Sequence, residues 1–501
     1  MNHVAIDLGA SGGTVYLGRV TPTTFDVREV YRFDNRPVER DGRYVWDVDA
    51  LVAEIESGLA AAAGHADRLG AGAERTARVD TVGIDTWGLD FGLLADGELL
   101  RAPTSYRDPE ATATREDLFE AVGKRRLFEA TGLTNWNTPN TLWQLHTIAD
   151  REPELLEESD GLLMMPQLLS ARIGGQPAGD VTIASTTQMV DPEARTWATD
   201  LLDELSVPMD LLPDLSEPGQ RLGPVDDTVI AGLSSTPEIV MPASHDTAAA
   251  VAGLPLAEDA AFLNTGSWFI LGVERDEPVR TDAAFEHAVS NELGVDGTVR
   301  LLKNINGFFL LEECRKAWRD ADDPADYDTL LSAAEKAPAR TALVDTDADT
   351  FGIDEPMPDQ IRTYCRRTDQ PMPTGQGGIV RCLLDSLAAK TALELDALAA
   401  VVEDPPSRIV LGGGGVRNEL FCQLLADATD RPVSTGPVEA TAVGNVLTQA
   451  VAAGTVPDIE TGRQLVESAF ETTTYEPQAG GEWDDAKDRL AALTDDSLSG
   501  A

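Results

Sequence analysis

The 501-residue chain is poor in cations, and in lysine above all. Six lysines stand among 39 Lys and Arg residues, against 86 Asp and Glu, so the formal net charge is −47. This excess excludes nucleic-acid binding through a basic face and disfavours docking on an anionic membrane. The acidic residues are spread along the whole chain, a pattern that suits a very salty cytoplasm in which dense ions screen self-repulsion. A single acidic patch for a cationic partner is the alternative.

Disulfides, metal-ligand spacings and membrane spans are equally scarce. The four cysteines contain no C-x-x-C pair and the five histidines are scattered, which argues against a disulfide framework and a structural zinc site. No stretch approaches the length of a membrane span, and residues 1–13 have neither the basic nor the apolar region of a signal peptide. We therefore expect a cytoplasmic protein whose 42% apolar residues form the cores of two large domains.

The two most common nucleotide-binding motifs are also missing. No G-x-x-x-x-G-K-[ST] occurs, which excludes a P-loop. The glycines at 412–415 do not open a βαβ unit with an acidic residue on its next strand, so they are no dinucleotide fingerprint. A nucleotide must therefore be held in another way, if one binds at all.

A strand, a glycine-containing turn and a second strand follow one another once in each half of the chain. Residues 3–8 and 14–20 predict one hairpin, and residues 259–266 and 268–274 predict the other. Further elements are expected as strands at 79–85 and 408–412, a hairpin at LDFGLLADGELL, and helical stretches at 114–130, 139–149 and 376–400. This pattern predicts an α/β protein of two similar domains, residues 1–243 and 244–501, with a cleft between them and a peripheral tail after 475.

Two of the turns have the composition of phosphate-binding backbone. The segment 7–14 combines glycines with Ser11, so that several N–H groups could point at one anion, and Asp7 at the strand end could hold Mg²⁺ through water. The segment 264–267 could form a similar turn. Taken alone, each is better explained as an ordinary hairpin turn.

Two further segments add to this picture. Four glycines at 412–415 lie between a strand and a helix and leave the backbone bare, so that adenosine and its α-phosphate could approach it. Ser244-His245-Asp246-Thr247 precedes a helix of small residues. Asp246 could simply cap that helix, or it could be the general base that takes a proton from a sugar hydroxyl.

Taken together and in this order, these segments resemble the FGGY carbohydrate kinases, which belong to the actin/hexokinase-like (ribonuclease H-like) ATPases. The resemblance covers residues 3–455 and is most specific in SHDTA, VWDVDAL and GPVEATAVGN, which are typical of the branch that acts on L-rhamnulose. The other segments that carry it are AIDLGASGGTVYLGRV, VGIDTWGLDFGLL, TSYRD, ASTTQMVD, FLNTGSWFILGVE, LLKNINGFFLLEECRKAW, RCLLDSLA and VLGGGGVRNELFCQLLADAT.

The resemblance implies ATP-dependent phosphorylation of a ketose with Asp246 as the general base. L-Rhamnulose is the favoured substrate, and L-fuculose, L-xylulose and D-xylulose remain open. The expected partners are the sugar and Mg-ATP, with no nucleic acid and no membrane. The chain is expected to be a monomer or a homodimer. The implied sugar-binding residues are Gly88, His245, Asp246, Thr247 and Asn304. The implied ATP-binding residues are Ala10, Ser11, Gly12, Gly13, Thr14, Ser267 and Gly414, with Gly413 and Gly415 beside Gly414 and Asn418 near the adenosine.

Three positions depart from the family pattern. Thr14 stands where an Arg usually ends the phosphate turn, Glu312 where a Gln is commoner, and Gln167 where an Asp is typical. These departures affect the identity of the sugar and the preferred nucleotide more than the expectation that a phosphoryl group is transferred. A non-catalytic actin-like ATP-binding module and a weakly catalytic sugar-binding regulator are the alternatives from other functional classes.

Aromatic and polar side chains could complete a sugar site. Trp46, Trp87 and Phe308 could offer a flat surface, although core packing explains each of them as well. Tyr106-Arg107-Asp108 could form a polar wall, or simply an exposed ion pair.

Overall fold

The computed structural model describes residues 1–69, 78–229, 235–352, 355–478 and 482–498, which form two compact units. The chain passes repeatedly from one unit to the other. Unit 1 comprises Met1–Pro255, Glu274–Leu301 and Glu439–Phe470, and unit 2 comprises Leu256–Val273, Leu302–Val438 and Glu471–Ala501. The two predicted domains, residues 1–243 and 244–501, are single contiguous segments, whereas each of these units is made of three segments. The division into domains stays a prediction.

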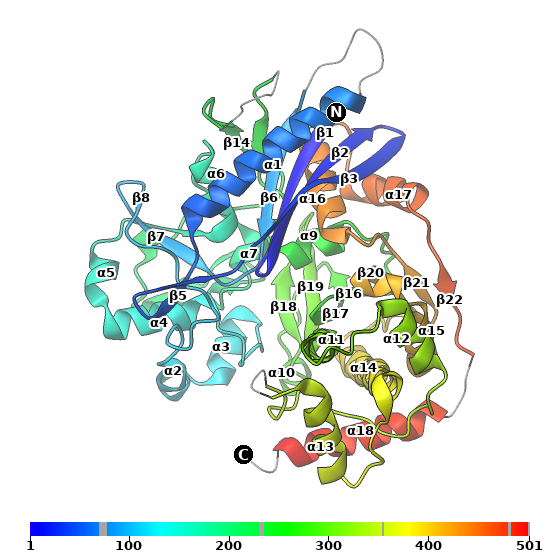
Figure 1. The fold of residues 1–501 in the computed structure, drawn as a ribbon. Coiled ribbons are helices and arrows are strands. Elements are labelled where there is room, and N and C mark those ends of the chain that lie inside the picture. The colour runs from blue at the N-terminus through cyan, green and yellow to red at the C-terminus, as the bar shows by residue number, and fades with distance from the viewer. Residues whose placement is uncertain (70–77, 230–234, 353–354, 479–481, 499–501) are drawn as a thin grey trace. The chain divides into compact units, whose positions relative to one another are not determined.

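Unit 1 is built on a six-stranded sheet with the order β14-β15-β6-β1-β2-β3 (Figure 1). The predicted N-terminal hairpin is confirmed as β1 (Asn2–Gly9) and β2 (Gly12–Thr21). The predicted strand at 79–85 is confirmed as β6 (Thr81–Thr86), which runs parallel to β1. The sheet is completed by β3 (Thr24–Asp34), β14 (Arg221–Pro224) and β15 (Glu238–Val240).

The two faces of this sheet carry different side chains. Val4, Ile6 and Leu8 enter a hydrophobic core beneath α1 (Val48–Leu69) and α6 (Met165–Arg172). The opposite face is covered by α9 (Asp246–Ala252) and α16 (Ala440–Ala452), two helices rich in alanine (Figure 1). Because side chains alternate along a strand, Asp7 lies on this second face with Ala5.

Helices α9 and α16 cross in close contact at two glycines. A Cβ atom added to Gly444 would lie 1.7 Å from the carbonyl oxygen of Ala249, and one added to Gly253 would lie 2.4 Å from that of Ala440. Only glycine lets the two backbones approach this closely. The crossing holds α9, and therefore its first residue Asp246, at a fixed distance from the sheet.

The rest of unit 1 agrees with the predicted pattern except near residue 123. The predicted hairpin is confirmed as β7 (Phe91–Ala95) and β8 (Glu98–Leu99), and the helix at 139–149 as α4 (Thr141–Arg151). The helical stretch at 114–130 is divided, because Gly123 has a φ of +83°. The two resulting helices and the remaining elements are α2 (Arg115–Val122), α3 (Lys124–Thr131), β4 (Val38–Arg40), β5 (Arg43–Val45), α5 (Pro153–Glu157), β9 (Gly161–Met164), β10 (Gly179–Asp180), α7 (Val181–Ala184), β11 (Val190–Asp191), β12 (Thr196–Trp197), α8 (Thr199–Glu204), η2 (Met209–Leu211), β13 (Leu215–Ser216), α10 (Asp282–Glu286), β18 (Ser290–Leu293) and α17 (Ile459–Ala469).

A seven-stranded sheet has the order β18-β19-β17-β16-β20-β21-β22. The unit boundaries fall within its strands β17 (Trp268–Arg275) and β19 (Val299–Asn306). The predicted second hairpin is confirmed as β16 (Ala260–Thr265) with β17, and β20 (Arg408–Gly413) runs parallel to β16. The short strands β21 (Val433–Thr435) and β22 (Thr474–Tyr475) follow β20.

The helices of unit 2 surround α14 (Gly375–Ala399), the predicted helix at 376–400. Most residues of α14 are buried, and it contacts α12 (Tyr327–Glu335), α15 (Glu419–Thr429) and α18 (Glu482–Leu498). The tail was expected to be peripheral, but α18 buries Trp483 and Leu490, so that expectation is wrong. The other elements are α11 (Phe309–Asp320), α13 (Met357–Arg367) and η3 (Gly414–Arg417).

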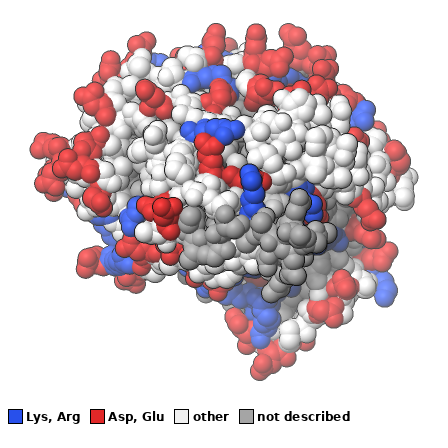
Figure 2. Space-filling view, turned by 90° about the horizontal axis from the view of Figure 1, so that it is seen from above, with Lys and Arg blue, Asp and Glu red and all other residues white. Residues whose placement is uncertain are grey.

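The surface reflects the acidic composition. Figure 2 shows a face on which acidic side chains gather around its rim and basic ones are few. The four cysteines are free and buried. None of the helices in the described ranges is long and apolar enough to cross a bilayer.

Candidate active site

Two carboxylates of unit 1 lie side by side near the ends of β1 and β6. Asp7 and Asp85 are register partners on these parallel strands. Asp85 is fully buried, and its Oδ2 accepts a hydrogen bond from Asn445 Nδ2 at 2.5 Å. Its Oδ1 has no partner within the part of the chain that the structure describes. A buried carboxylate oxygen without a donor is rare, and it is typical of a position that a ligand or cation completes.

Burial and repulsion make both carboxylates hard to ionise. Burial raises the pKa of Asp7 to about 7, and the negative charges of Asp246 and Glu439 add to this effect. Burial also raises the pKa of Asp85 well above its usual value, and the charge of Asp7 adds to it. A cation placed between these groups would relieve the repulsion and favour their ionised forms.

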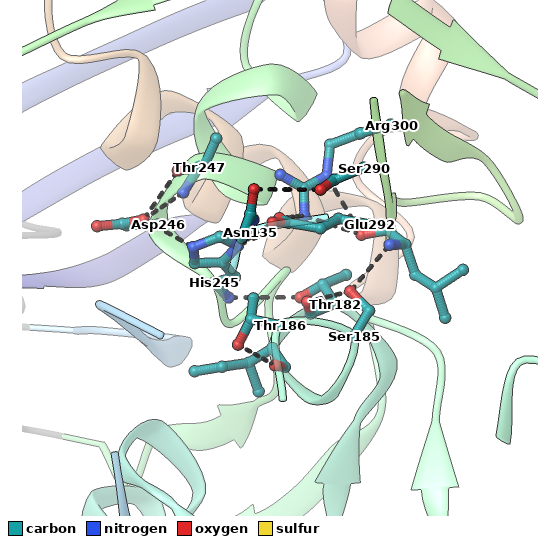
Figure 3. Close-up of polar contacts among 12 residues, drawn as sticks. Asn135, Thr182, Ser185, Thr186, His245, Asp246, Thr247, Ser290, Glu292 and Arg300 are labelled. Carbon is teal, nitrogen blue, oxygen red and sulfur yellow. Dashed lines mark hydrogen bonds and ion pairs between the residues drawn. The ribbon is translucent and has the colours of Figure 1, made fainter. Parts of the chain in front are cut away.

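Asp246 is the first residue of α9, beside these two carboxylates. Its Oδ1 accepts hydrogen bonds from the backbone N–H of Thr247 at 2.5 Å and from the Thr247 hydroxyl at 3.1 Å. The other carboxylate oxygen points away from these partners in Figure 3, and the side chain is 33% exposed. Asp246 therefore has one occupied oxygen and one that is free to accept a proton.

Backbone contacts anchor the segment that leads into α9. The N–H of Thr86 at the end of β6 donates to the carbonyl of Ser244 at 2.9 Å. Asp180 Oδ1 accepts the N–H of Ser244 at 3.3 Å and also caps α7 through the N–H groups of Thr182 and Ile183. Burial raises the pKa of Asp180 to about 6, although these donors oppose the shift. The strand ends and the start of α9 thus form one connected framework.

His245 lies between two acidic side chains. Its Nε2 is 3.4 Å from Asp246 Oδ1, and its Nδ1 is 3.4 Å from Glu292 Oε2 on β18. The fully buried Arg300 on β19 is 3.1 Å from the same Glu292 oxygen (Figure 3). His245, Asp246 and Thr247 are consecutive in the chain, and the structure places Glu292 and Arg300 in contact with His245.

Gly88 follows β6 in the same unit. A Cβ atom there would lie 3.0 Å from Thr186 Oγ1, so the backbone is tightly bounded on that side. The nearby Asp90 is buried and accepts hydrogen bonds from Trp46 Nε1 at 2.6 Å and Trp87 Nε1 at 3.0 Å. Trp46 has no exposed surface and Trp87 only 6%, so core packing explains both rings better than stacking on a sugar.

The predicted phosphate turn of unit 1 is the tip of the β1–β2 hairpin. Ala10 and Ser11 form the tip, and Gly9 pairs with Gly12 across it. A Cβ atom at Gly13 would lie 2.3 Å from a ring carbon of Phe33, so packing against this ring also favours glycine at this position.

Two side chains give this turn its chemical character. Thr14 is the register partner of Asp7 across the hairpin and is buried. The Ser11 hydroxyl accepts a hydrogen bond from Arg107 Nη2 at 3.3 Å, and the Arg107 guanidinium also lies over the Tyr106 ring. The predicted polar wall therefore contributes a cation to the turn.

Unit 2 brings its own two glycine turns together. The Thr265 hydroxyl donates to the carbonyl of Gly412 at 2.6 Å and accepts the N–H of Gly415 at 2.8 Å. A Cβ atom at Gly413 or Gly415 would collide with Thr265 at 2.3 or 2.5 Å, whereas one at Gly414 meets nothing within 4 Å. Packing against Thr265 therefore explains why Gly413 and Gly415 are glycines. It does not explain the glycine at position 414.

Other predicted residues of unit 2 have local roles or stand apart from this turn. Ser267 follows Thr265, and its carbonyl accepts the N–H of Gly307 at 2.9 Å. Asn304 lies on β19 in unit 2, whereas the other predicted sugar-binding residues belong to unit 1. The Asn418 amide caps α15 by accepting the N–H of Phe421 at 3.0 Å.

The remaining candidates are occupied by packing or by ion pairs. Phe308 packs edge-on against Phe269 and Phe421. Glu312 forms an ion pair with Arg315 one turn later on α11. Gln167 is buried in α6, and its Oε1 has no partner among the residues placed by the structure.

Asp85, Glu292 and Arg300 are site residues that the sequence analysis did not assign. The signal for Asp85 is a carboxylate inside an otherwise apolar strand, VGIDT. Glu292 and Arg300 are likewise charged residues within strands that are buried over most of their length. Charges in buried strands are costly and indicate a specific partner.

This arrangement can accept a proton at Asp246 and attract a cation to Asp7 and Asp85. Across the described ranges, no three His, Cys, Asp or Glu side chains form a group that could hold a metal by themselves. Mg²⁺ usually takes one or two carboxylates from a protein and completes its shell with water and phosphate oxygens. A pair of acidic side chains is therefore sufficient for a metal that arrives with a phosphate ligand.

Comparison with known proteins gives a match over nearly the whole chain. The model of the "FGGY family of carbohydrate kinases, N-terminal domain" matches residues 4–253, and that of its C-terminal domain matches residues 261–453. A rhamnulokinase from Bacteroides thetaiotaomicron is 38% identical over 489 residues, which cover 97% of this chain and 98% of the relative. A rhamnulokinase from Oceanobacillus iheyensis is 31% identical over 475 residues, which cover 94% and 98%.

Solved structures share the same fold at low sequence identity. A ligand-bound xylulose kinase from Lactobacillus acidophilus has a TM-score of 0.80 with 14% identity, covering 100% of this chain and 99% of that one. A gluconate kinase from the same organism has a TM-score of 0.79 with 15% identity, covering 100% and 98%. The predicted α/β fold of two actin/hexokinase-like domains is confirmed.

Proposed function

This chain belongs to the FGGY family of carbohydrate kinases, and from that premise we propose that it phosphorylates L-rhamnulose with ATP, giving L-rhamnulose 1-phosphate and ADP. The observation that carries the proposal is the Asp246 carboxylate, which has one oxygen held by Thr247 and the other free. The full-length similarity to rhamnulokinases supports the choice of sugar.

The reaction asks Asp246 to act as a general base. The proton of the sugar's primary hydroxyl moves to Asp246 Oδ2 while the oxygen forms a bond to the γ-phosphorus. The bond from that phosphorus to the bridging oxygen breaks, and its electron pair stays on ADP. A well-placed base is worth about 10²–10⁴ in rate, and the remaining catalysis comes from positioning and charge compensation.

Mg²⁺ fits the acidic pair in unit 1. The Oδ1 of Asp85, which has no hydrogen-bond partner among the residues that the structure describes, and the buried position of Asp7 beside other acidic side chains support this fit. We assign Asp7, through water, as the residue that holds the metal, with Asp85 beside it. Bound there, Mg²⁺ would supply charge neutralisation for the phosphate oxygens.

The residues that the family resemblance assigns to ATP are found in both units. We assign the phosphate groups to Ala10, Ser11, Gly12, Gly13 and Thr14 in unit 1, where the Arg107 guanidinium touches the turn. We assign the nucleoside side to Ser267 and Gly414 in unit 2. The open space at Gly414 supports this assignment, because no protein atom explains the missing side chain.

The sugar is assigned to the residues around the base. Gly88, His245 and Thr247 lie in unit 1 with Asp246, and the family resemblance adds Asn304, which belongs to unit 2. Polar side chains that are left unpaired by the wrong stereoisomer give strong discrimination between hydroxyl patterns. The protein would use such contacts to favour L-rhamnulose over L-fuculose, L-xylulose and D-xylulose.

The test is ADP release from Mg-ATP against these four ketoses and glycerol, with wild type, Asp246→Asn and the control Asp200→Asn. Asparagine can still accept the Thr247 N–H, so we expect the fold to persist while turnover with L-rhamnulose falls about 10²–10⁴-fold. Asp200 occupies the first turn of α8 and is exposed, so its replacement should leave turnover unchanged. Near-normal turnover in Asp246→Asn would reject the base, and a clear preference for another ketose would reject the substrate.

We also propose that the protein works in a cytoplasm of high ionic strength. The support is the net charge of −47, with acidic side chains gathered on the surface in Figure 2. The Debye length falls from about 10 Å at 0.1 M salt to about 3 Å at 1 M, so concentrated KCl would screen most of the self-repulsion. We expect the melting temperature to rise steadily from 0.1 M to 2 M KCl, and a melting temperature independent of KCl would contradict this.

A further inference from the structure

We propose that Glu292 and Arg300 are positioning residues that fix the tautomer and orientation of His245, which in turn holds Oδ1 of Asp246 and leaves Oδ2 as the proton acceptor. This inference rests on the proposed kinase function and concerns residues one and two contacts removed from the base. It assigns them an effect on chemistry rather than on folding alone.

The four side chains form a continuous chain of contacts from the base into the protein interior (Figure 3). Asp246 Oδ1 is 3.4 Å from His245 Nε2, and His245 Nδ1 is 3.4 Å from both Glu292 Oε2 and Arg300 Nη2. Arg300 Nη2 is also 3.1 Å from Glu292 Oε2 and from the carbonyl of Leu293. Contacts of 3.4 Å are at the long end of the hydrogen-bond range.

Stability alone does not explain Arg300. The side chain is fully buried, and its Nη1 has no hydrogen-bond partner in the portion of the protein described here. A buried guanidinium with an unpaired nitrogen is costly, and apolar side chains often replace buried ion pairs with a gain in stability. The contact that distinguishes Arg300 from such a replacement is the one to Nδ1 of His245.

Both members of the pair are charged. Burial alone would raise the pKa of Glu292, but its contacts with His245 and the charge of Arg300 outweigh it and lower that pKa. Burial lowers the pKa of Arg300, and the surrounding carboxylates oppose this shift. An arginine stays protonated in proteins, so Glu292 is an anion paired with a cation.

These charges decide where His245 carries its proton. Nε2 faces the carboxylate of Asp246, so it must carry a hydrogen and donate it, since a lone pair there would face an anion. Nδ1 faces a guanidinium that can only donate and a carboxylate already paired with it. Nδ1 therefore keeps its lone pair, and His245 is the neutral Nε2–H tautomer.

A neutral donor suits a general base better than a cation does. An imidazolium beside Asp246 would stabilise its carboxylate form and weaken it as a proton acceptor. The charged groups around this position are Asp246 on α9, Glu292 on β18, Glu274 on β17 and Asp180 on β10, and Arg300 is the cation that interacts with all four. Removing that cation should therefore release the tautomer of His245 that it fixes.

The experiment compares wild type with Arg300→Met and Glu292→Gln by two readouts. The first is the ¹⁵N spectrum of the five histidines, with the His245 signals assigned from a His245→Gln sample. We expect wild-type His245 to show the neutral Nε2–H pattern. In Arg300→Met, Nδ1 faces the Glu292 carboxylate without the guanidinium, so this pattern should change to one in which Nδ1 carries a hydrogen. Glu292→Gln keeps the guanidinium and should retain the wild-type pattern.

The second readout is kinetic. In Arg300→Met we expect kcat with L-rhamnulose to fall about 10–10²-fold, with the ketose KM changed less than about threefold. The shape of the kcat–pH profile should differ from that of wild type. The double variant Glu292→Gln/Arg300→Gln, which removes both charges, should return the His245 spectrum towards that of wild type, because no carboxylate then faces Nδ1.

A control separates these effects from lost stability. Arg381 and Asp385 form another buried ion pair, on α14 in unit 2. Arg381→Met should lower the melting temperature but leave the His245 signals and the kcat–pH profile unchanged. Arg300→Lys keeps the charge and serves if Arg300→Met does not fold; it should retain the neutral pattern of His245.

The outcomes distinguish this inference from the proposed function. If wild type phosphorylates no ketose, the proposed function is wrong, and the histidine spectra still decide the positioning of His245. If the His245 signals are the same in wild type, Arg300→Met and Glu292→Gln, the inference is overturned whatever the activity. A kinase whose variants keep the wild-type kcat and pH profile would overturn it as well.

Discussion

Replacing Gly444 by alanine should displace α9 and, with it, the catalytic carboxylate of Asp246. The added Cβ atom would lie 1.7 Å from the carbonyl oxygen of Ala249 and 2.8 Å from the backbone nitrogen of Gly253. Both neighbours are backbone atoms, one in α9 and one in Gly253 directly after it, so no side-chain rotation can relieve the contact. The helices must separate instead, although α16 and α9 are each packed against the sheet.

The size of the effect follows from this distance. A normal carbon–oxygen contact needs a separation of about 3.2 Å, so the two helices must move apart by about 1.5 Å. Overpacking of a core typically costs about 1–3 kcal/mol, and a backbone collision belongs at the upper end of that range. A displacement of about 1 Å in a reacting group can cost about 10²-fold in rate, so kcat should fall by about that factor.

The assay pairs thermal unfolding with kcat for wild type, Gly444→Ala and Gly64→Ala. Gly64 lies exposed on α1, and a Cβ atom there meets nothing within 4 Å. Alanine should therefore stabilise that helix by about 0.5–1 kcal/mol and leave kcat unchanged. If Gly444→Ala kept both the melting temperature and the kcat of wild type, the close crossing and its role in placing Asp246 would be refuted.

Two further predictions address other parts of the protein. Burial raises the pKa of Asp90 to about 6, above its unfolded value, so folding favours its protonated form and stability due to this group falls as the pH rises to 6. Urea unfolding between pH 8 and 5 should show wild type gaining about 1.4 kcal/mol over Asp90→Asn for each pH unit below 6, and parallel curves would contradict this. Gly414→Val should raise the KM for ATP about tenfold with kcat and melting temperature nearly unchanged, because the side chain would occupy only the space assigned to the nucleotide. An unchanged KM for ATP would remove Gly414 from that site.

The local elements of the fold were predictable because their signals are local. The hairpin of β1 and β2 has alternating apolar residues around a glycine turn, and α14 has a continuous helical period. Gly123 divides a predicted helical stretch because its backbone adopts a left-handed φ, which no residue pattern nearby announces. The burial of Trp483 in the acidic tail depends on unit 2 as a whole, so composition alone suggested the wrong environment.

The candidate site was predictable only where sequence neighbours act together. Asp246 and Thr247 are adjacent, and their hydrogen bonds follow from the start of α9. The contacts of Glu292 and Arg300 with His245 join residues that lie about 50 positions apart, and no spacing rule connects them. The glycines at 413 and 415 looked like ligand positions, but the collisions with Thr265 show that packing also requires them.

The late position of α16 in the chain has a consequence for the protein's synthesis. Residues 440–452 cover the face of β1 and β6 that carries Asp7 and Asp85, yet they leave the ribosome after more than four fifths of the polypeptide. Until then the first strands to be made expose Ala5 and a row of polar groups that are meant to be buried. Unit 1 therefore cannot finish folding during translation of the N-terminal half, and a chaperone that shields this surface from aggregation would act on nearly full-length chains.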